Sequence, residues 1–161
     1  MKEYIYEGLG FPIELNNVEM IFVNGEYAPK IDVRSVADKA MKNLVLQKTK
    51  LTGNQVKFIR SYFSLSLRDF GKIVNESHTA VRKWEKFNNK STNMDPNIET
   101  RIRVYVYDKI CIRNKNDKLK FYDQYHAITE IISQQENKNL HHLGLTAELC
   151  SKVVYGGKLT N

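Results

Sequence analysis

The sequence predicts a mainly α protein, a bundle of helices with a small β element at the N-terminus and further helices at the C-terminus. Three observations support this fold class. Apolar residues recur at helical spacing in most segments after residue 32. Side chains that favour helix N-caps precede several of these segments. Before residue 32, short apolar runs alternate with turn-forming residues, which is typical of β-hairpins.

The N-terminal β element is expected to contain strands near residues 11–15, 19–23 and 26–29. Asn24 and Gly25 separate the last two runs, and Asn-Gly between apolar runs is a strong signal for a tight hairpin turn. Pro29 places the last strand at an edge or a terminus, because proline has no N–H to donate to a neighbouring strand.

A lone hairpin is only marginally stable in water, so its apolar side chains need a covering surface. The side chains concerned are Phe11, Ile13, Ile21 and Val23. The covering surface could be the helix that follows, a second copy of the chain or another protein. Of these we favour pairing of the N-terminal segment across a dimer.

The helical part begins after Asp32, whose carboxylate can accept hydrogen bonds from the free N–H groups of a first turn. We therefore expect a helix from about residue 33 to residue 47. Further helices are expected to start at Thr52, Ser66, Ser77 and Asp95-Pro96. Proline supports the last of these, because it is favoured in a first helical turn.

The C-terminal part begins with a polar linker at 113–118. Apolar residues at helical spacing then predict a helix at 119–135, followed by a polar gap at 136–142. Thr146 is expected to cap a last helix, which Gly156 can end.

These elements divide the chain into three predicted parts: residues 1–48, 49–112 and 113–161. The net charge of +7 comes from the middle, because residues 50–120 contain 16 basic and 7 acidic residues, while the flanks contain 9 and 11. A basic segment favours partners with phosphate backbones, since each neutralised phosphate releases condensed counterions. On charge alone, a basic surface that serves only solubility is an equal alternative.

Several other classes of protein find no support in the sequence. No apolar run is long enough to cross a bilayer and the start lacks a signal-peptide core, so we expect a cytoplasmic protein. Cys111 and Cys150 are isolated, which favours buried thiols over a zinc site or a disulfide. The histidines lack the spacing of a catalytic or metal-binding set, and no motif of an RNA-binding module is present. We therefore expect neither an enzyme nor a cofactor.

Two short helices, at 66–74 and 77–88, are expected on either side of a tight turn, and this is the signature of a helix-turn-helix. Gly71 lies inside the first helix, where it costs up to ~1 kcal/mol relative to alanine; a close crossing of the second helix would explain it. Val81 and Trp84 lie three residues apart and face inward together. The outward side of the second helix consists of His78, Thr79, Arg82, Lys83 and Lys86. Such donors suit base edges and phosphates.

Residues 51–86, LTGNQVKFIRSYFSLSLRDFGKIVNESHTAVRKWEK, resemble the Xre-type helix-turn-helix of the HigA/MqsA class of toxin–antitoxin antitoxins. Upstream, GFPIELNNVEMIFVNGEYAPKIDV is similar to the small N-terminal domain and linker helix of that class, so the resemblance covers about residues 8–112. It implies a lambda-repressor-like helical bundle. The chain departs from the class in two ways: the cysteine pairs of its zinc-binding members are absent, and Leu67 stands where glutamine is common.

Carried over by position, the resemblance assigns base reading to His78, Thr79, Arg82 and Lys83. It assigns phosphate contacts to Ser66, Arg68, Lys86 and Lys90. Arg101 and Arg103, on the next helix, are weaker candidates, and Trp84 and Glu85 receive a packing role. No residue is assigned to a metal, and the N-terminal segment is expected to fold without one.

The resulting hypothesis is a sequence-specific DNA-binding transcriptional regulator, a repressor that serves as the autoregulating antitoxin of a type II toxin–antitoxin system. Its partners would be double-stranded DNA with a palindromic operator and a toxin protein held by the N-terminal segment or the C-terminal helices. A homodimer is expected, because one helix reads only a half-site. The alternatives are a stand-alone Xre-type repressor and a protein-interaction module that has lost DNA binding.

Overall fold

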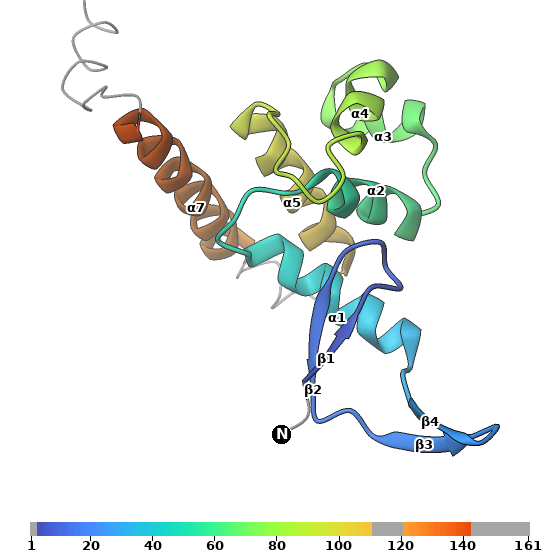
Figure 1. Cartoon of the computed structure of the whole chain (residues 1–161). Coiled ribbons are helices and arrows are strands. Elements are labelled where there is room, and N and C mark those ends of the chain that lie inside the picture. The colour runs from blue at the N-terminus through green and yellow to red at the C-terminus, as the bar shows by residue number, and fades with distance from the viewer. Residues whose placement is uncertain (1–2, 111–120, 143–161) are drawn as a thin grey trace, which may run out of the picture.

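The computed structural model describes residues 3–110 and 121–142 of the chain. These residues form a mainly helical protein with a small N-terminal β element, in agreement with the predicted fold class (Figure 1). The strands are β1 (Glu3–Tyr6), β2 (Ile13–Asn16), β3 (Met20–Val23) and β4 (Glu26–Pro29). The helices are α1 (Val33–Leu46), α2 (Gly53–Tyr62), α3 (Leu67–Val74), α4 (His78–Glu85), α5 (Pro96–Ile110) and α7 (Phe121–His142).

The β element consists of two separate antiparallel hairpins, β1–β2 and β3–β4. In the first, Tyr4 pairs with Leu15 and Tyr6 with Ile13. The sequence prediction missed β1, although tyrosine and isoleucine favour strands. A four-residue strand carries little periodic signal, and β1 is defined by its pairing with β2 rather than by its own pattern.

The turn of the second hairpin is confirmed. Asn24 and Gly25 have φ angles of 51° and 88°. A two-residue turn with positive φ at both positions matches the right-handed twist of the strands that it joins. The predicted strands at 19–23 and 26–29 agree with β3 and β4 to within one residue.

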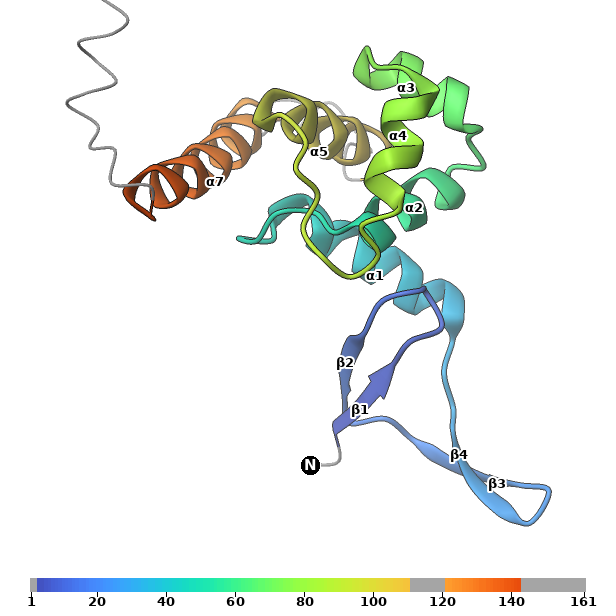
Figure 2. The ribbon, with the colours of Figure 1, turned by 45° about the horizontal axis from the view of Figure 1, so that its top comes forward.

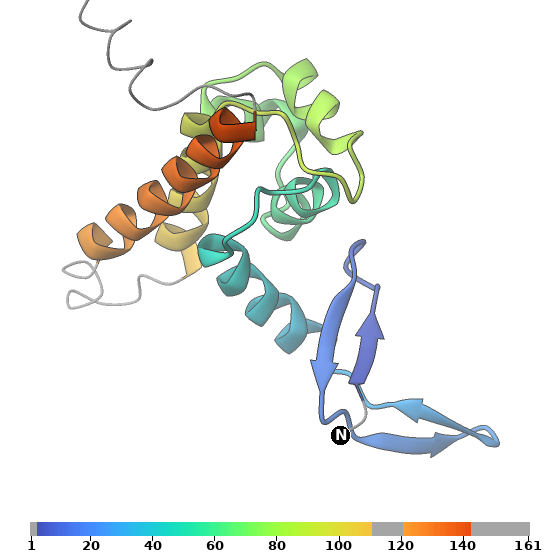
Figure 3. The same ribbon diagram turned by 60° about the vertical axis from the view of Figure 1, so that its left-hand side comes forward.

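Only the first hairpin packs on the helices. Phe11, in the loop between β1 and β2, is buried, and its ring lies 5.4 Å from that of Phe58 on α2. The β3–β4 hairpin instead projects from the body of the protein (Figure 3). Ile13 is half-buried, whereas Ile21 and Val23 are exposed. The helix α1 therefore does not cover the second hairpin.

The predicted helix starts are confirmed by their hydrogen bonds. Asp32 accepts from the backbone N–H groups of Arg34 and Ser35. Thr52 and Gln55 form a reciprocal capping box at the start of α2. The other caps, with their acceptor side chains, are Ser66 for α3, Ser77 for α4 and Asp95 for α5.

The hydrophobic core joins side chains from every predicted part of the chain. Phe11, Val45, Ile102 and Ile128 belong to one buried cluster, which α1, α5 and α7 form together with α2, α3 and α4.

Tyr62 connects α2 to α1, because its hydroxyl donates a hydrogen bond of 2.5 Å to Asp38. This hydrogen bond raises the pKa of Tyr62 above 10.0. The boundaries near residues 48 and 112 stay predictions.

The prediction of a polar gap at 136–142 is wrong, because α7 continues to His142. The segment contains neither glycine nor proline, so no residue in it breaks the helix. Within the described part of the chain, no helix has the length and apolar character that a membrane span requires. The linker at 113–118, Cys111, Cys150, Thr146 and Gly156 lie outside the described residues.

A buried ion pair on α5 ties the end of α1 to the start of α2. Arg103 and Glu99 are each 1 % exposed, and their side chains approach to 2.6 Å. Arg103 also donates to the backbone carbonyls of Val45, Gln47 and Thr49. The prediction that Arg103 contacts phosphate is therefore wrong: helical spacing places it on the inner face of α5.

We predict that Arg103→Leu lowers the free energy of unfolding by about 3–5 kcal/mol, because it leaves the Glu99 carboxylate buried without its partner. Arg103→Lys should retain only part of this stability, since one ammonium cannot replace five N–H donors. Urea denaturation gives both values. The exposed substitution Lys42→Leu serves as control, and a loss of less than about 1 kcal/mol in Arg103→Leu would contradict the assigned role.

Candidate nucleic-acid interface

The helices α3 and α4 are joined by the three residues Asn75, Glu76 and Ser77, close to the predicted arrangement. Asn75 ends α3 with a left-handed φ of 59°. The Glu76 N–H then donates to the carbonyl of Gly71 at 2.8 Å, and the Ser77 hydroxyl accepts from the N–H of Ala80. These bonds satisfy backbone groups at both helix ends, so the turn is fixed.

Gly71 permits the close approach of this turn. A Cβ atom at Gly71 would lie 2.5 Å from the carbonyl oxygen of Glu76 and 3.4 Å from the nitrogen of His78. The predicted close contact is therefore present, but the turn and the first residue of α4 make it, rather than a crossing further along that helix.

The inner face of α4 is held by packing and by an ion pair. Val81 is 0 % and Trp84 7 % exposed, as the sequence predicts. Glu85 accepts two hydrogen bonds from Arg60 on α2, at 2.6 and 3.1 Å. Arg60 further donates to the carbonyl of Leu65. The packing role of Trp84 and Glu85 thus includes a bidentate contact that fixes the rotation of α4.

The end of α4 rests on the start of α2. The N–H groups of Gly53 and Asn54 donate to the carbonyls of Lys90 and Asn88. A Cβ atom at Gly53 would lie 2.6 Å from the carbonyl oxygen of Trp84. This contact was not predicted from the sequence; the available signal was a glycine directly after the Thr52 cap, where other residues make better helices. The predicted helix 77–88 ends earlier, at Glu85, because Asn88 turns the chain with a φ of 50°.

The outer face of α4 is exposed along its length, and α4 with α3 lies at the end of the molecule opposite the β3–β4 hairpin (Figures 1 and 2). The exposed side chains on this face are His78, Thr79, Arg82, Lys83 and Lys86. The structure therefore brings together the four side chains predicted to read bases. The Thr79 hydroxyl lies 2.8 Å from that of Ser77, and either can be the donor.

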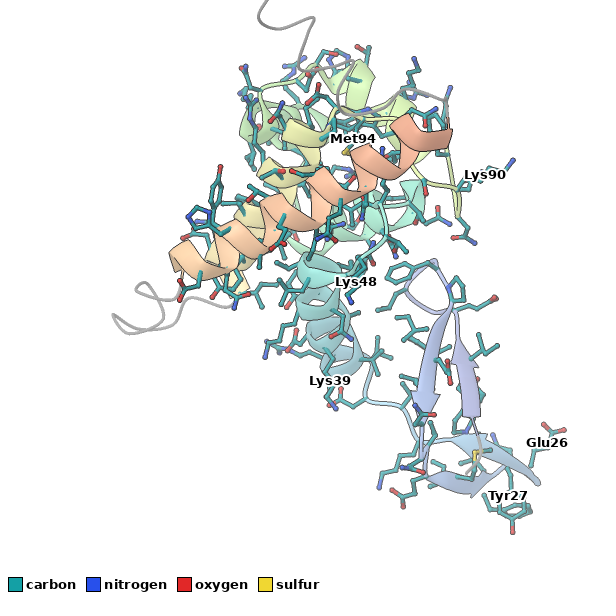
Figure 4. The ribbon with its side chains drawn as sticks, turned by 90° about the vertical axis from the view of Figure 1, so that its left-hand side faces the viewer. Glu26, Tyr27, Lys39, Lys48, Lys90 and Met94 are labelled. Atoms are coloured by element: carbon teal, nitrogen blue, oxygen red, sulfur yellow. The ribbon has the colours of Figure 1, made fainter. Side chains whose placement is uncertain are left out.

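The side chains predicted to contact phosphate differ in their availability. Arg68, Lys86 and Lys90 are exposed, and Lys90 projects from the loop that follows α4 (Figure 4). Ser66 is exposed too, but its hydroxyl donates to the carboxylate of Asp69 at 2.6 Å. Ser66 has one O–H group, so it must exchange this bond before it can donate to a phosphate.

A hollow of about 600 Å³ joins the two predicted sets. Its lining residues are Lys83, Lys86, Phe87, Asn88, Asn89 and Lys90. Three ammonium groups around one concave surface suit a polyanion, and asparagine amides can donate as well as accept. In the sequence, Asn88 and Asn89 indicate only a turn, since their position beside the lysines depends on the fold of the loop.

The remaining candidates have structural contacts. Arg101 is exposed, and one of its nitrogens donates to the carbonyl of Val74 at the end of α3. Leu67, which replaces the common glutamine, is half-buried and packs against the core. Leu67 thus contributes apolar packing at the start of α3, where a glutamine would place a polar amide group.

The described residues contain no group of three or more His, Cys, Asp or Glu side chains that could hold a metal ion. No protein-family model matches this chain, and searches of curated proteins and of solved structures found no match. The interpretation of the α4 surface therefore depends on its geometry and charge.

We predict that Gly71→Ala destabilises the protein by about 1–3 kcal/mol, because the added methyl group must displace the backbone of the turn. The better helix propensity of alanine offsets up to ~1 kcal/mol of this cost. Thermal unfolding measures the loss, and the fluorescence of Trp84, the only tryptophan, reports whether α4 moves. Lys72→Ala, at the exposed neighbouring position, should leave both signals unchanged. Equal stability of the two variants would show that the turn is not constrained at Gly71.

Proposed function

We propose that this protein is a sequence-specific DNA-binding transcriptional regulator, in which α3 and α4 act as a helix-turn-helix of the lambda-repressor-like, Xre type. One observation carries the proposal: α4 is fixed on its inner face, while its whole outer face is exposed, polar and basic. A fixed helix with such a face suits the major groove of DNA, which admits an α-helix.

The chemistry of the outer face supports a division of roles. Arg82 and Lys83 can donate to the O6 and N7 acceptors of guanine, and the methyl group of Thr79 can contact a thymine methyl. Lys86, Lys90 and Arg68 offer charge to the phosphates on either side of the groove. Two copies would read a palindromic operator, since each α4 covers one half-site.

Within this class, the resemblance of residues 8–112 favours an autoregulating antitoxin over a stand-alone repressor. An antitoxin needs a surface for a toxin in addition to its DNA surface. A protein-interaction module that has lost DNA binding is the second candidate, and the exposed apolar β3–β4 hairpin favours it. The two candidates differ in their behaviour toward DNA, so binding experiments separate them.

Affinity for a duplex taken from upstream of its own gene should fall steeply with salt. The expected slope of log K against log salt concentration is roughly −0.9 for each phosphate contacted. Fluorescence anisotropy over a salt series measures it, with an unrelated duplex as the reference for non-specific binding. An affinity that stays flat between low and moderate salt would exclude the proposal.

Arg82→Ala and Lys83→Ala should each weaken binding to the cognate duplex by about 1–3 kcal/mol and relax the preference at one base pair. Lys90→Ala should weaken binding to cognate and random duplexes alike, because it contacts only phosphate. Lys39→Ala is the matched control, since Lys39 lies on α1, well away from Lys90 (Figure 4). The division of roles fails if the first three variants affect cognate and random DNA equally.

A further inference from the structure

The exposed apolar surface of this protein is concentrated on its β element. Ten large apolar side chains are exposed within the described residues, and six of them precede residue 28. These six are Ile5, Met20, Ile21, Phe22, Val23 and Tyr27. Single exposed apolar residues are normal, whereas a contiguous group marks a surface that another molecule covers.

We propose that β3 pairs edge to edge with β3 of a second copy of this chain, antiparallel about a two-fold axis, and that this pairing forms the dimer interface.

The strand β3 is apolar on both faces. Side chains alternate along a strand, so Ile21 and Val23 point to one face and Met20 and Phe22 to the other. All four are exposed, at 37–64 %. The ring of Phe22 also meets that of Tyr27 at 5.2 Å. Strands with two apolar faces are typical of sheet interiors, not of free hairpins.

The hydrogen bonds of the hairpin identify β3 as its open edge. Lys30 donates to the carbonyl of Glu19 at 2.8 Å, so every second residue from Glu19 turns its backbone groups toward β4. Met20 and Phe22 therefore turn their N–H and C=O groups outward. On β4 the outward positions include Pro29, which has no N–H, so that edge is blunted.

The charges around β3 allow two copies to approach. No charged side chain occurs from residue 20 to residue 25. Two carboxylates flank this stretch: Glu19 is paired with Lys30 of its own chain at 3.1 Å, and Glu26 lies opposite Val23 on β4, away from the outward edge of β3. Exposed edges are normally protected by charged residues, and β3 has no such protection. An antiparallel pair about a two-fold axis is self-complementary, since each copy offers the same outward groups of Met20 and Phe22.

The apolar surface of the hairpin sets an upper limit on the area that the dimer can bury. Phe22 and Tyr27 are 64 % and 73 % exposed. With Met20, Ile21 and Val23 they leave roughly 500 Å² uncovered on each copy, given that an aromatic side chain can bury up to ~250 Å². Pairing along the edge covers only part of this area on each copy, so the main-chain hydrogen bonds between the two β3 strands must contribute the rest of the affinity.

The position of the β3–β4 hairpin is compatible with a dimer interface. It lies at the opposite end of the molecule from α3 and α4, so pairing through β3 leaves α4 accessible (Figure 2). Tyr27 and Glu26 mark its outer end, clear of the helices (Figure 4). The need for two copies rests on the proposed function, whereas the interface can be measured without DNA.

Sedimentation equilibrium of the full chain tests the proposal. The wild type should be dimeric at high micromolar concentration. Phe22→Glu should lower the association constant roughly tenfold or more, because like charges on paired strands repel. An equimolar mixture of Phe22→Glu and Phe22→Lys should restore dimers. Val33→Glu, at a large apolar side chain that is 51 % exposed on α1, should leave association unchanged.

A wild type that stays monomeric at every concentration would overturn the proposal and would indicate that a different protein covers the hairpin. A dimer unaffected by Phe22→Glu would overturn it too. Circular dichroism should show that Phe22→Glu remains folded. Binding of that monomeric variant to a half-site duplex separates the two proposals. If half-site binding is retained, DNA recognition stands independently of dimerisation through β3. If the wild type dimerises through β3 but does not bind DNA, only the proposed function is excluded.

Discussion

The buried pair of Arg103 and Glu99 is the interaction on which the arrangement of the helices depends. Its hydrogen bonds reach from α5 to three carbonyls in the last turn of α1 and the segment after it, and to the N–H of Leu51. Leu51 is directly followed by the cap of α2, and the first N–H groups of α2 hold the loop after α4. The position of α4 is thus connected to α5 through side-chain hydrogen bonds of Arg103 and Glu99 and then through backbone hydrogen bonds at the start of α2. Burying two charged groups costs free energy, so both Arg103 and Glu99 need hydrogen-bond partners in the folded protein.

The helix α4 is held in one position and one rotation before any partner binds. Backbone approaches at Gly71 and Gly53 and the contact between Arg60 and Glu85 fix its start, its end and its rotation. A surface that is already ordered loses little conformational entropy when it binds. The proposed function requires this fixed rotation, because a rotated α4 would carry Arg82 and Lys83 away from the base edges that they are proposed to read.

The chemistry of the surface is divided between two ends of the molecule. Basic side chains gather on α4 and the loop after it, while exposed apolar side chains gather on the β3–β4 hairpin. The two surfaces suit different partners: one attracts a polyanion, and the other needs to be removed from water. Because they lie at opposite ends (Figure 1), both can be occupied together. This separation is what a regulator needs if it is to bind DNA and assemble at the same time.

The local structure could be predicted from the amino-acid sequence alone. Capping residues at Asp32, Thr52, Ser66 and Ser77, the Asn24-Gly25 turn and the inward pair of Val81 and Trp84 all act within a few residues, so their patterns predicted the elements correctly. The exposed face of α4 followed from the same helical periodicity. Features that depend on residues far apart in the sequence could not be predicted in this way. The carbonyl partners of Arg103, the hollow beside Lys90 and the uncovered β3–β4 hairpin were not evident in the sequence, because each results from the way separate segments pack, which local periodicity does not encode.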